Sequence, residues 1–290
     1  MEAEQILVRI IETPVEIKTS KVDSYLINYI VSGSGKPVLL IHGLNMGWGA
    51  WYQNISELAK YFTVYAIDLP GAGGSTKIDF SQLDLQRDFV DVVGKFIKNL
   101  GIEAIDIIGH SSGGWVALQV ASKFNNLVTR VILVSSLGFT DYVPASQRLA
   151  SNKLVTSILV KTIMRPTYKS IEMFLKSIAN MPLEREFIEY VVESFTRNKL
   201  THPLFLMNRL MKGPNLSTEI IFTDDFLRRV TQPVLIIHGR HDELVPIDMI
   251  FERIKLIPNS EIEIFENAGH VLYMEEKEEF EKIVHAFLKK

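Results

Sequence analysis

The chain has 290 residues, 47% of them hydrophobic and 22% charged, with a formal net charge of −3 and no cysteine. This composition is typical of a globular protein with a sizeable core, and it gives no basic surface for nucleic acid. The missing cysteines exclude disulfides, thiolate metal sites and a cysteine nucleophile. No apolar run approaches the ~18 residues needed to span a bilayer. The N-terminus lacks the basic and apolar regions of a signal peptide, so we expect a cytoplasmic protein without a membrane span.

Strand-like and helix-like segments alternate along most of the chain. We expect strands at 15–19, 25–31, 38–42, 62–67, 105–108, 130–135, 233–237 and 261–265, and helices at 85–100, 112–124, 246–256 and 272–289. Continuous apolar strands separated by helices indicate a mainly parallel sheet that is covered on both faces.

The alternation stops between residues 139 and 225. This segment contains no convincing strand, is interrupted by five prolines, and holds five of the nine methionines. An all-helical insertion of this kind is most simply a cap over the carboxyl ends of the strands, where open α/β sheets bind ligands. We therefore predict a core domain of residues 1–138 and 226–290, with a helical cap of residues 139–225. Some cap methionines should line an adaptable apolar pocket.

Ser111 lies in the pattern Gly-x-Ser-x-Gly, between the expected strand at 105–108 and the expected helix at 112–124. The chain must reverse sharply there, which predicts a strained serine whose hydroxyl projects above the sheet. Gly109 and Gly113 remove side chains that would collide as the strand and helix cross. In this context Ser111 is the candidate nucleophile.

A serine nucleophile needs a base, and the base needs an orienting acid. His270 is the candidate base, because it lies in the loop that follows the last expected strand. Asp242, in the loop after the strand at 233–237, is the candidate acid, with Glu243 and Asp141 as rivals. The other histidines fit structural or surface roles better: His42, His110, His202, His238, His241 and His285.

The loop after the strand at 38–42 is a candidate oxyanion site. The backbone N–H groups of Leu44 and Ser112 would hold the developing negative charge. Trp48, Met46, Phe139 and Val271 are expected to line the substrate pocket. The glycine-rich turn at 68–75 lacks the spacing of a nucleotide-binding loop, and we interpret it as structural.

Taken together, these motifs resemble those of α/β-hydrolase fold enzymes over nearly the whole chain. The matching pieces are His42-Gly43, Asp68-x-x-Gly71-x-Gly73-x-Ser75, Gly109-x-Ser111-x-Gly113, Asp242-x-x-Val245-Pro246 and Gly269-His270. The resemblance implies an eight-stranded, mainly parallel sheet, a helical cap inserted after the sixth strand, a serine triad, and no cofactor or metal. A serine at position 111 argues against the dehalogenases and epoxide hydrolases of the family, which carry aspartate there.

The cap around residues 166–172 is also similar to that of meta-cleavage-product hydrolases, which break carbon–carbon bonds. Those enzymes usually have Ser-Gly-x-Gly-like residues after His-Gly and a tryptophan after the catalytic histidine. At these two places this chain has Leu44-Asn45-Met46 and Val271. We therefore predict a carboxylesterase acting on a small-molecule ester of a small to medium apolar acid. A carbon–carbon hydrolase and a non-catalytic receptor remain as alternatives, and the sequence leaves the oligomeric state open.

Overall fold

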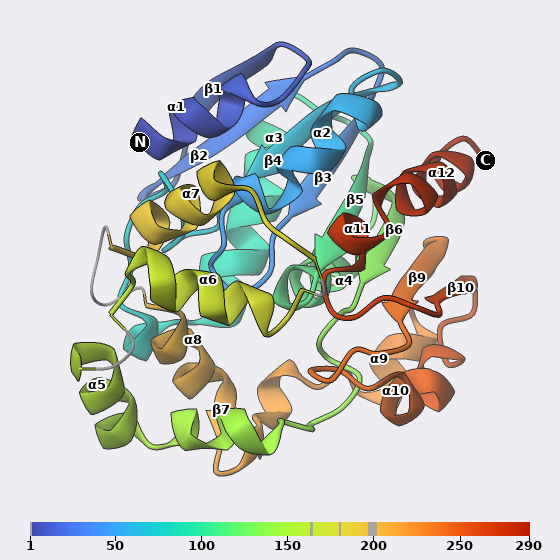
Figure 1. The fold of residues 1–290 in the computed structure, drawn as a ribbon. Helices are drawn as coiled ribbons and strands as arrows, with labels where there is room; N and C mark the ends of the chain where they lie inside the picture. The colour runs from blue at the N-terminus through green and yellow to red at the C-terminus, as the bar shows by residue number, and fades with distance from the viewer. Residues whose placement is uncertain (1, 163–164, 180, 197–201) are drawn as a thin grey trace.

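The structure, a computed structural model, describes residues 2–162, 165–179, 181–196 and 202–290 (Figure 1). Eight strands form one sheet in the order β1-β2-β4-β3-β5-β6-β9-β10. Strand β2 is antiparallel to both of its neighbours, and the remaining pairs are parallel. The predicted mainly parallel, eight-stranded α/β fold is therefore confirmed. The strands are β1 (Val15–Val22), β2 (Tyr25–Ser32), β3 (Lys36–Ile41), β4 (Phe62–Ile67), β5 (Ile105–His110), β6 (Val128–Val134), β9 (Val234–Gly239) and β10 (Ser260–Phe265).

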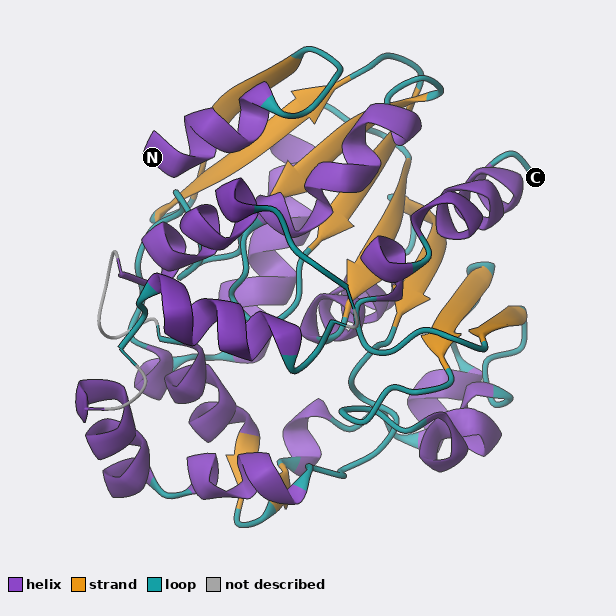
Figure 2. Ribbon diagram, in the orientation of Figure 1, coloured by secondary structure: helices purple, strands orange, loops and turns teal. Residues whose placement is uncertain are grey.

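Helices cover both faces of this sheet (Figure 2). The helices of the sheet layers are α1 (Glu2–Arg9), α2 (Tyr52–Leu58), α3 (Val92–Asn99), α4 (Ser112–Lys123), α9 (Asp224–Arg228), α10 (Ile247–Ile254), α11 (Leu272–Glu275) and α12 (Lys277–Leu288). Shorter helical turns are η1 (Trp48–Trp51), η2 (Phe80–Gln82) and the π-helical η3 (Gln86–Asp91).

Successive side chains of the central strands enter two separate cores. In β3, Leu39 and Ile41 belong to the core that also contains residues of α3, α4 and α10, while Val38 and Leu40 belong to the core that contains residues of α2 and α12. This period of two is the geometry of a pleated strand buried on both faces. It explains why the central strands have continuous apolar sequences.

Between β6 and β9 the chain forms a largely helical excursion. Its elements are η4 (Ala145–Ser151), α5 (Lys153–Thr162), α6 (Tyr168–Lys176), α7 (Arg185–Thr196), α8 (Pro203–Leu210), β7 (Met211–Lys212), β8 (Asn215–Leu216) and η6 (Thr218–Ile220). The two-residue strands β7 and β8 pair as a small hairpin, which the sequence did not indicate. This segment occupies the place expected for a cap, and its treatment as a separate domain stays a prediction.

Three further features differ from the sequence prediction. Helix α1 and the helical run from η1 to α2 were not expected. The C-terminal helix is broken at Glu276, whose φ of −126° and ψ of 55° are not helical, so that α11 and α12 are separate. In the described ranges, no helix is long and apolar enough to cross a membrane.

Candidate active site

Ser111 lies at the sharp turn from β5 into α4. Its φ of 53° and ψ of −118° are strained for a residue with a side chain, at a cost of roughly 1–3 kcal/mol. Its N–H donates to the Val134 carbonyl at 2.9 Å, and its own carbonyl accepts from Leu137 N–H at 3.1 Å. These bonds to the end of β6 and to the following loop hold the serine in its strained conformation.

The glycines around Ser111 are required by close backbone contacts. A Cβ atom on Gly109 would lie 2.3 Å from the Gly113 carbonyl oxygen. A Cβ atom on Gly113 would lie 2.4 Å from the His42 carbonyl oxygen. Since real Cβ atoms do not approach backbone this closely, both positions need glycine for β5 and α4 to cross.

His270 and Asp242 form a direct pair, as the sequence analysis expected of a base and its acid. The Nδ1 atom of His270 lies 2.8 Å from Oδ2 of Asp242, and both side chains are almost fully buried. Their loops meet closely: a Cβ atom on Gly239 would lie 2.2 Å from the Gly269 carbonyl oxygen. With Nδ1 engaged, Nε2 is the ring nitrogen of His270 that remains for proton transfer.

The surroundings of Asp242 favour its ionised form. Burial by itself would raise the pKa of this carboxyl group. The charge of His270, its hydrogen bond, His238 and the Val245 N–H outweigh burial and lower the pKa to about 2. Oδ1 accepts the N–H groups of Leu244 and Val245, each at 2.9 Å, so the orienting carboxylate is fixed on both oxygens.

Burial favours the neutral form of three other histidines near this site. Burial lowers the pKa of His42 to about 4 and that of His110 to about 3, and it also lowers the pKa of His238. His42 Nε2 accepts the Leu69 N–H at 3.1 Å. His238 Nε2 donates to the Val245 carbonyl at 2.7 Å and lies 3.5 Å from Asp242 Oδ2.

His110 connects the nucleophile turn to the His270 loop. Its Nε2 atom donates to the His270 carbonyl at 2.9 Å, and the two imidazole rings lie 4.8 Å apart. This contact was missed by sequence reasoning, because the two residues are 160 positions apart.

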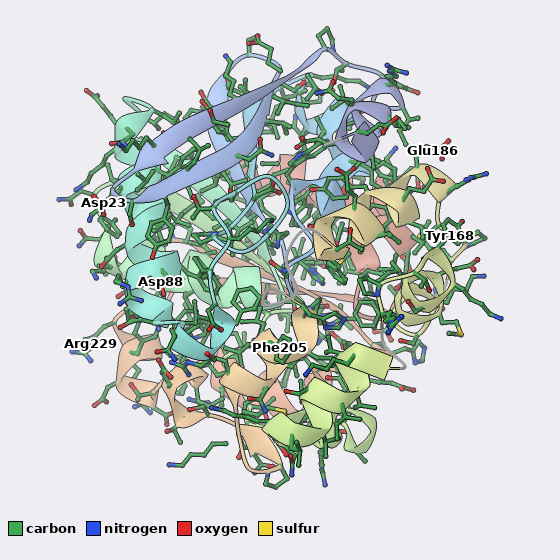
Figure 3. All side chains as sticks on the ribbon, turned by 90° about the vertical axis from the view of Figure 1, so that its left-hand side faces the viewer. Asp23, Asp88, Tyr168, Glu186, Phe205 and Arg229 are labelled. Atoms are coloured by element: carbon green, nitrogen blue, oxygen red, sulfur yellow. The ribbon has the colours of Figure 1, made fainter. Side chains whose placement is uncertain are left out.

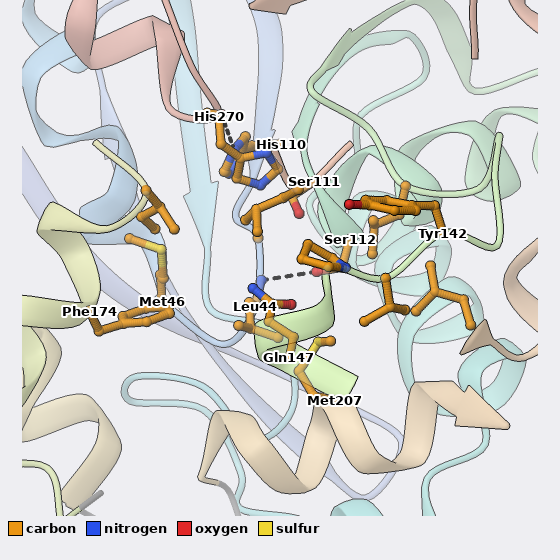
Figure 4. A pocket seen from close by; sticks show the side chains of 17 residues that line it. Leu44, Met46, His110, Ser111, Ser112, Tyr142, Gln147, Phe174, Met207 and His270 are labelled. Carbon is orange, nitrogen blue, oxygen red and sulfur yellow. Dashed lines mark hydrogen bonds between the residues drawn. The ribbon is translucent and has the colours of Figure 1, made fainter. Parts of the chain in front are cut away.

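A pocket with about 680 Å³ of empty space, counting the solvent at its mouth, opens above Ser111 (Figure 4). The loops after β3, β5, β9 and β10 and the segment between β6 and β9 all contribute to it, as expected at the carboxyl edge of such a sheet. Its lining residues are Gly43, Leu44, Met46, His110, Ser111, Ser112, Leu137, Tyr142, Val143, Pro144, Gln147, Phe174, Ile178, Met207, Leu216, Leu244 and His270. The wall is mainly apolar, and within the described residues it contains no lysine, arginine, aspartate or glutamate.

Of the four residues expected to line the pocket, the structure brings only Met46 to this cavity. Trp48, Phe139 and Val271 are nearly fully buried elsewhere in the two cores. Trp48 is held away by its indole N–H, which donates to Glu4 of α1 at 2.7 Å.

Of the methionines between residues 139 and 225, one lines the cavity and others pack in the cores or are exposed. Met207 lines the cavity, Met181 and Met211 pack with the cores, Met173 is 58% exposed, and Met164 lies outside the described residues.

The two residues with the candidate oxyanion donors are in direct contact. Ser112 opens α4, and the first N–H groups of a helix have no acceptor within that helix. The Leu44 N–H donates to the Ser112 hydroxyl oxygen at 3.0 Å, a contact drawn in Figure 4. In this structure the Leu44 N–H is therefore already hydrogen-bonded to the Ser112 hydroxyl. An oxyanion would have to replace that hydroxyl as its acceptor.

The glycine-rich turn at 68–75 encloses a buried carboxylate. Asp68 accepts the N–H groups of Trp48 and Gly74, each at 2.7 Å, and the Asn28 amide at 2.8 Å. The same Asn28 amide donates to Glu4 of α1, so hydrogen bonds through Asn28 connect α1 to the turn. These bonds fit a structural role for the turn. Among the described residues, no three histidine, aspartate or glutamate side chains are grouped as metal ligands.

Comparison with known proteins identifies the family. A family described as "alpha/beta hydrolase fold" matches residues 36–277, which is most of the chain. The chain belongs to the alpha/beta hydrolase fold family. This confirms the resemblance noted from its motifs.

Individual relatives of this alpha/beta hydrolase differ in their reactions. The chain is 26% identical over 268 residues to the 2-hydroxy-6-oxo-6-(2'-aminophenyl)hexa-2,4-dienoic acid hydrolase of Metapseudomonas resinovorans, covering 90% of this chain and 86% of that protein. It is 25% identical over 251 residues to the pimeloyl-[acyl-carrier protein] methyl ester esterase of Vibrio cholerae, covering 86% and 93%. The carboxylesterase CesB (YbfK) of Bacillus subtilis shares the fold, with a TM-score of 0.81, 23% identity, and coverage of 99% and 96%. The family supports a hydrolase with a small-molecule substrate, and these relatives include both esterases and a hydrolase of a dienoic acid.

Proposed function

We propose that this alpha/beta hydrolase cleaves carboxylic esters of small to medium apolar acids through a Ser111 acyl-enzyme. One observation carries the proposal. A strained serine and a histidine bonded to a buried aspartate line the same apolar cavity.

In the proposed reaction, His270 Nε2 takes the proton of the Ser111 hydroxyl as its oxygen attacks the ester carbonyl. Asp242 holds the imidazole in the matching orientation and stabilises the imidazolium. The N–H groups of Leu44 and Ser112 would bind the oxyanion, the former exchanging its contact with the Ser112 hydroxyl. His270 then protonates the leaving alcohol, and water, activated by the same histidine, hydrolyses the acyl-enzyme.

The lining of the cavity favours an ester over the substrate of the carbon–carbon hydrolases. The Metapseudomonas relative acts on a dienoic acid, whose carboxylate is ionised at neutral pH. A buried anion needs a cationic or strongly hydrogen-bonding partner. The described wall offers no lysine or arginine, and its neutral polar side chains besides Ser111 and His270 are His110, Ser112, Tyr142 and Gln147.

Replacing the nucleophile tests the proposed reaction directly. Ser111→Ala should lower kcat for p-nitrophenyl butyrate by about 10⁴-fold or more, with an unchanged melting temperature. Ser81→Ala, at an exposed serine, is the matched control and should retain full turnover. Residual turnover of the Ser111 variant within about tenfold of the parent would remove Ser111 from the mechanism.

The alternative functions need separate experiments. Comparing kcat/KM for the butyrate ester and for a 2-hydroxy-6-oxo-dienoic acid separates the two hydrolase reactions, and a higher value for the dienoic acid would reverse our choice.

A fluorophosphonate probe should label the parent protein and not the Ser111→Ala variant. No labelling of the parent would favour the non-catalytic receptor.

A further inference from the structure

The loop that carries the Leu44 N–H is a tight turn in an unfavourable conformation. The Met46 N–H donates to the Gly43 carbonyl at 3.0 Å, which closes a four-residue turn. Both central residues have a positive φ, 22° at Leu44 and 60° at Asn45. Turns with this pattern strongly favour glycine, asparagine or aspartate at the two positions. Asn45 suits the turn, whereas Leu44 is strained in it.

Two contacts hold this turn against the nucleophile turn. Gly43 packs so closely that a Cβ atom there would lie 2.9 Å from both Ser111 Cβ and His110 Nδ1. The Leu44 N–H donates to the Ser112 hydroxyl oxygen at 3.0 Å (Figure 4). Backbone strain persists only where the surrounding structure holds the chain in place. The packing at Gly43 limits the distance of the turn, and the Ser112 hydroxyl fixes the direction of the strained N–H.

The Ser112 hydroxyl combines a fixed base with a movable oxygen. Ser112 is the first residue of α4, and its side chain lines the cavity above Ser111. Its oxygen occupies an acceptor position of the Leu44 N–H, the donor expected to face the oxyanion. A serine side chain can turn between staggered rotamers while the backbone keeps its shape. A water molecule would satisfy the same N–H without tying the turn to α4.

We propose that the Ser112 side chain is a positioning residue, which holds the Leu44 N–H in the direction that the oxyanion needs. This inference rests on the proposed ester hydrolysis and adds a side chain to the backbone donors named there. In the empty protein the hydroxyl oxygen accepts the N–H. As the ester carbonyl oxygen becomes negative, it replaces the hydroxyl, which turns aside. The donor is then already aimed when the charge develops, as electrostatic preorganisation requires.

Removing the hydroxyl tests this role through kcat. Ser112→Ala should lower kcat for p-nitrophenyl butyrate by about tenfold or more, with KM within about threefold of the parent, because the oxyanion exists only after the attack. The inhibition constant of butaneboronic acid, which forms a tetrahedral adduct with a serine nucleophile, should rise by a similar factor. A merely structural role of the hydroxyl would lower the melting temperature without this division between kcat and KM.

A matched pair of variants separates the hydroxyl from the shape of the side chain. Ser112→Thr keeps a hydroxyl and should retain kcat within about threefold of the parent. Ser112→Val has nearly the same shape without a hydroxyl and should reproduce the loss expected for Ser112→Ala. This pair also keeps the inference testable if Ser112→Ala does not fold, as judged by its thermal unfolding transition.

Two further variants control for the loss of a hydroxyl elsewhere. Ser56→Ala removes the same kind of bond from a residue that does not line the cavity, since the Ser56 hydroxyl accepts the Glu12 N–H at 3.2 Å. Tyr168→Phe removes the hydroxyl of a side chain that is 39% exposed and lies at the right-hand edge of the molecule in Figure 3. Both variants should retain kcat within about twofold of the parent.

The possible outcomes separate this inference from the proposed function. An unchanged or higher kcat in folded Ser112→Ala would overturn the inference, because the hydroxyl would then only obstruct the site. A rise in KM alone, or equal kcat values for Ser112→Thr and Ser112→Val, would also overturn it. Each of these results leaves ester hydrolysis by Ser111 intact. If the parent protein hydrolysed no p-nitrophenyl ester, the proposed function would fail, and this inference with it.

Discussion

The Asp242→Asn variant tests the electrostatics of the candidate acid through folding stability. In the folded protein the pKa of Asp242 falls from 3.8 to about 2. A lowered folded-state pKa means that the ionised group stabilises the protein above its unfolded pKa, and that this stabilisation is lost as the pH falls through the folded value. A shift of nearly two units corresponds to about 2 kcal/mol.

The stabilisation by ionised Asp242 should change with pH, which distinguishes it from other effects of the substitution. The full stabilisation of about 2 kcal/mol should be present at pH 5, and about half of it should remain at pH 3. Urea unfolding of the parent and of Asp242→Asn at both pH values measures the two stability differences. Effects of the new amide that do not depend on pH cancel when the two differences are compared.

Asp141→Asn is the matched control, because Asp141 is exposed and is one of the two rival acids named from the sequence. Its stability difference should be within about 0.5 kcal/mol of zero at both pH values. If the Asp242→Asn difference were the same at pH 5 and at pH 3, the reasoning about a buried, stabilised carboxylate would be wrong.

Three further variants test other parts of the structure. Gly113→Ala should destabilise the fold by at least about 2 kcal/mol and abolish ester turnover, because its methyl group meets the His42 carbonyl; a thermal melt with normal stability would contradict this. Glu4→Ala should cost about 1–3 kcal/mol in urea unfolding by leaving the Trp48 indole N–H without its acceptor, and an unchanged midpoint would refute that role. Burial raises the pKa of Glu281 from 4.5 to about 7, so the parent should lose up to about 3 kcal/mol of stability between pH 4.5 and pH 8. Glu281→Gln should remove this loss, and parallel stability curves for the two proteins would count against it.

The nucleophile turn was predictable from sequence because its constraints are local. The strand before Ser111, the helix after it and the two flanking glycines all lie within a short segment. The order of serine, acid and histidine along the chain could likewise be recognised, since each was expected at the end of a strand. The pairing of Asp242 with His270 follows from that placement.

The pocket was harder to predict because side-chain direction depends on distant partners. Trp48 follows the oxyanion loop in sequence, but Glu4, on a helix that was not expected, holds its indole in the core. Phe139 packs edge-on against Phe222 with ring centroids 5.3 Å apart. Proximity to a catalytic loop along the chain could not show that these rings turn away from the cavity.

The contact between His110 and the His270 carbonyl has a consequence for how this protein could admit its substrate. The turn that carries the nucleophile and the loop that carries the base are joined directly, without any residue of the segment between β6 and β9. Helices α5 to α8 take part neither in this contact nor in the Leu137 bond to Ser111, so their rearrangement can change which molecules enter while the spacing of the reacting groups is preserved. Access and chemical reactivity become separable properties, and the covering helices can diversify without rebuilding the reaction centre.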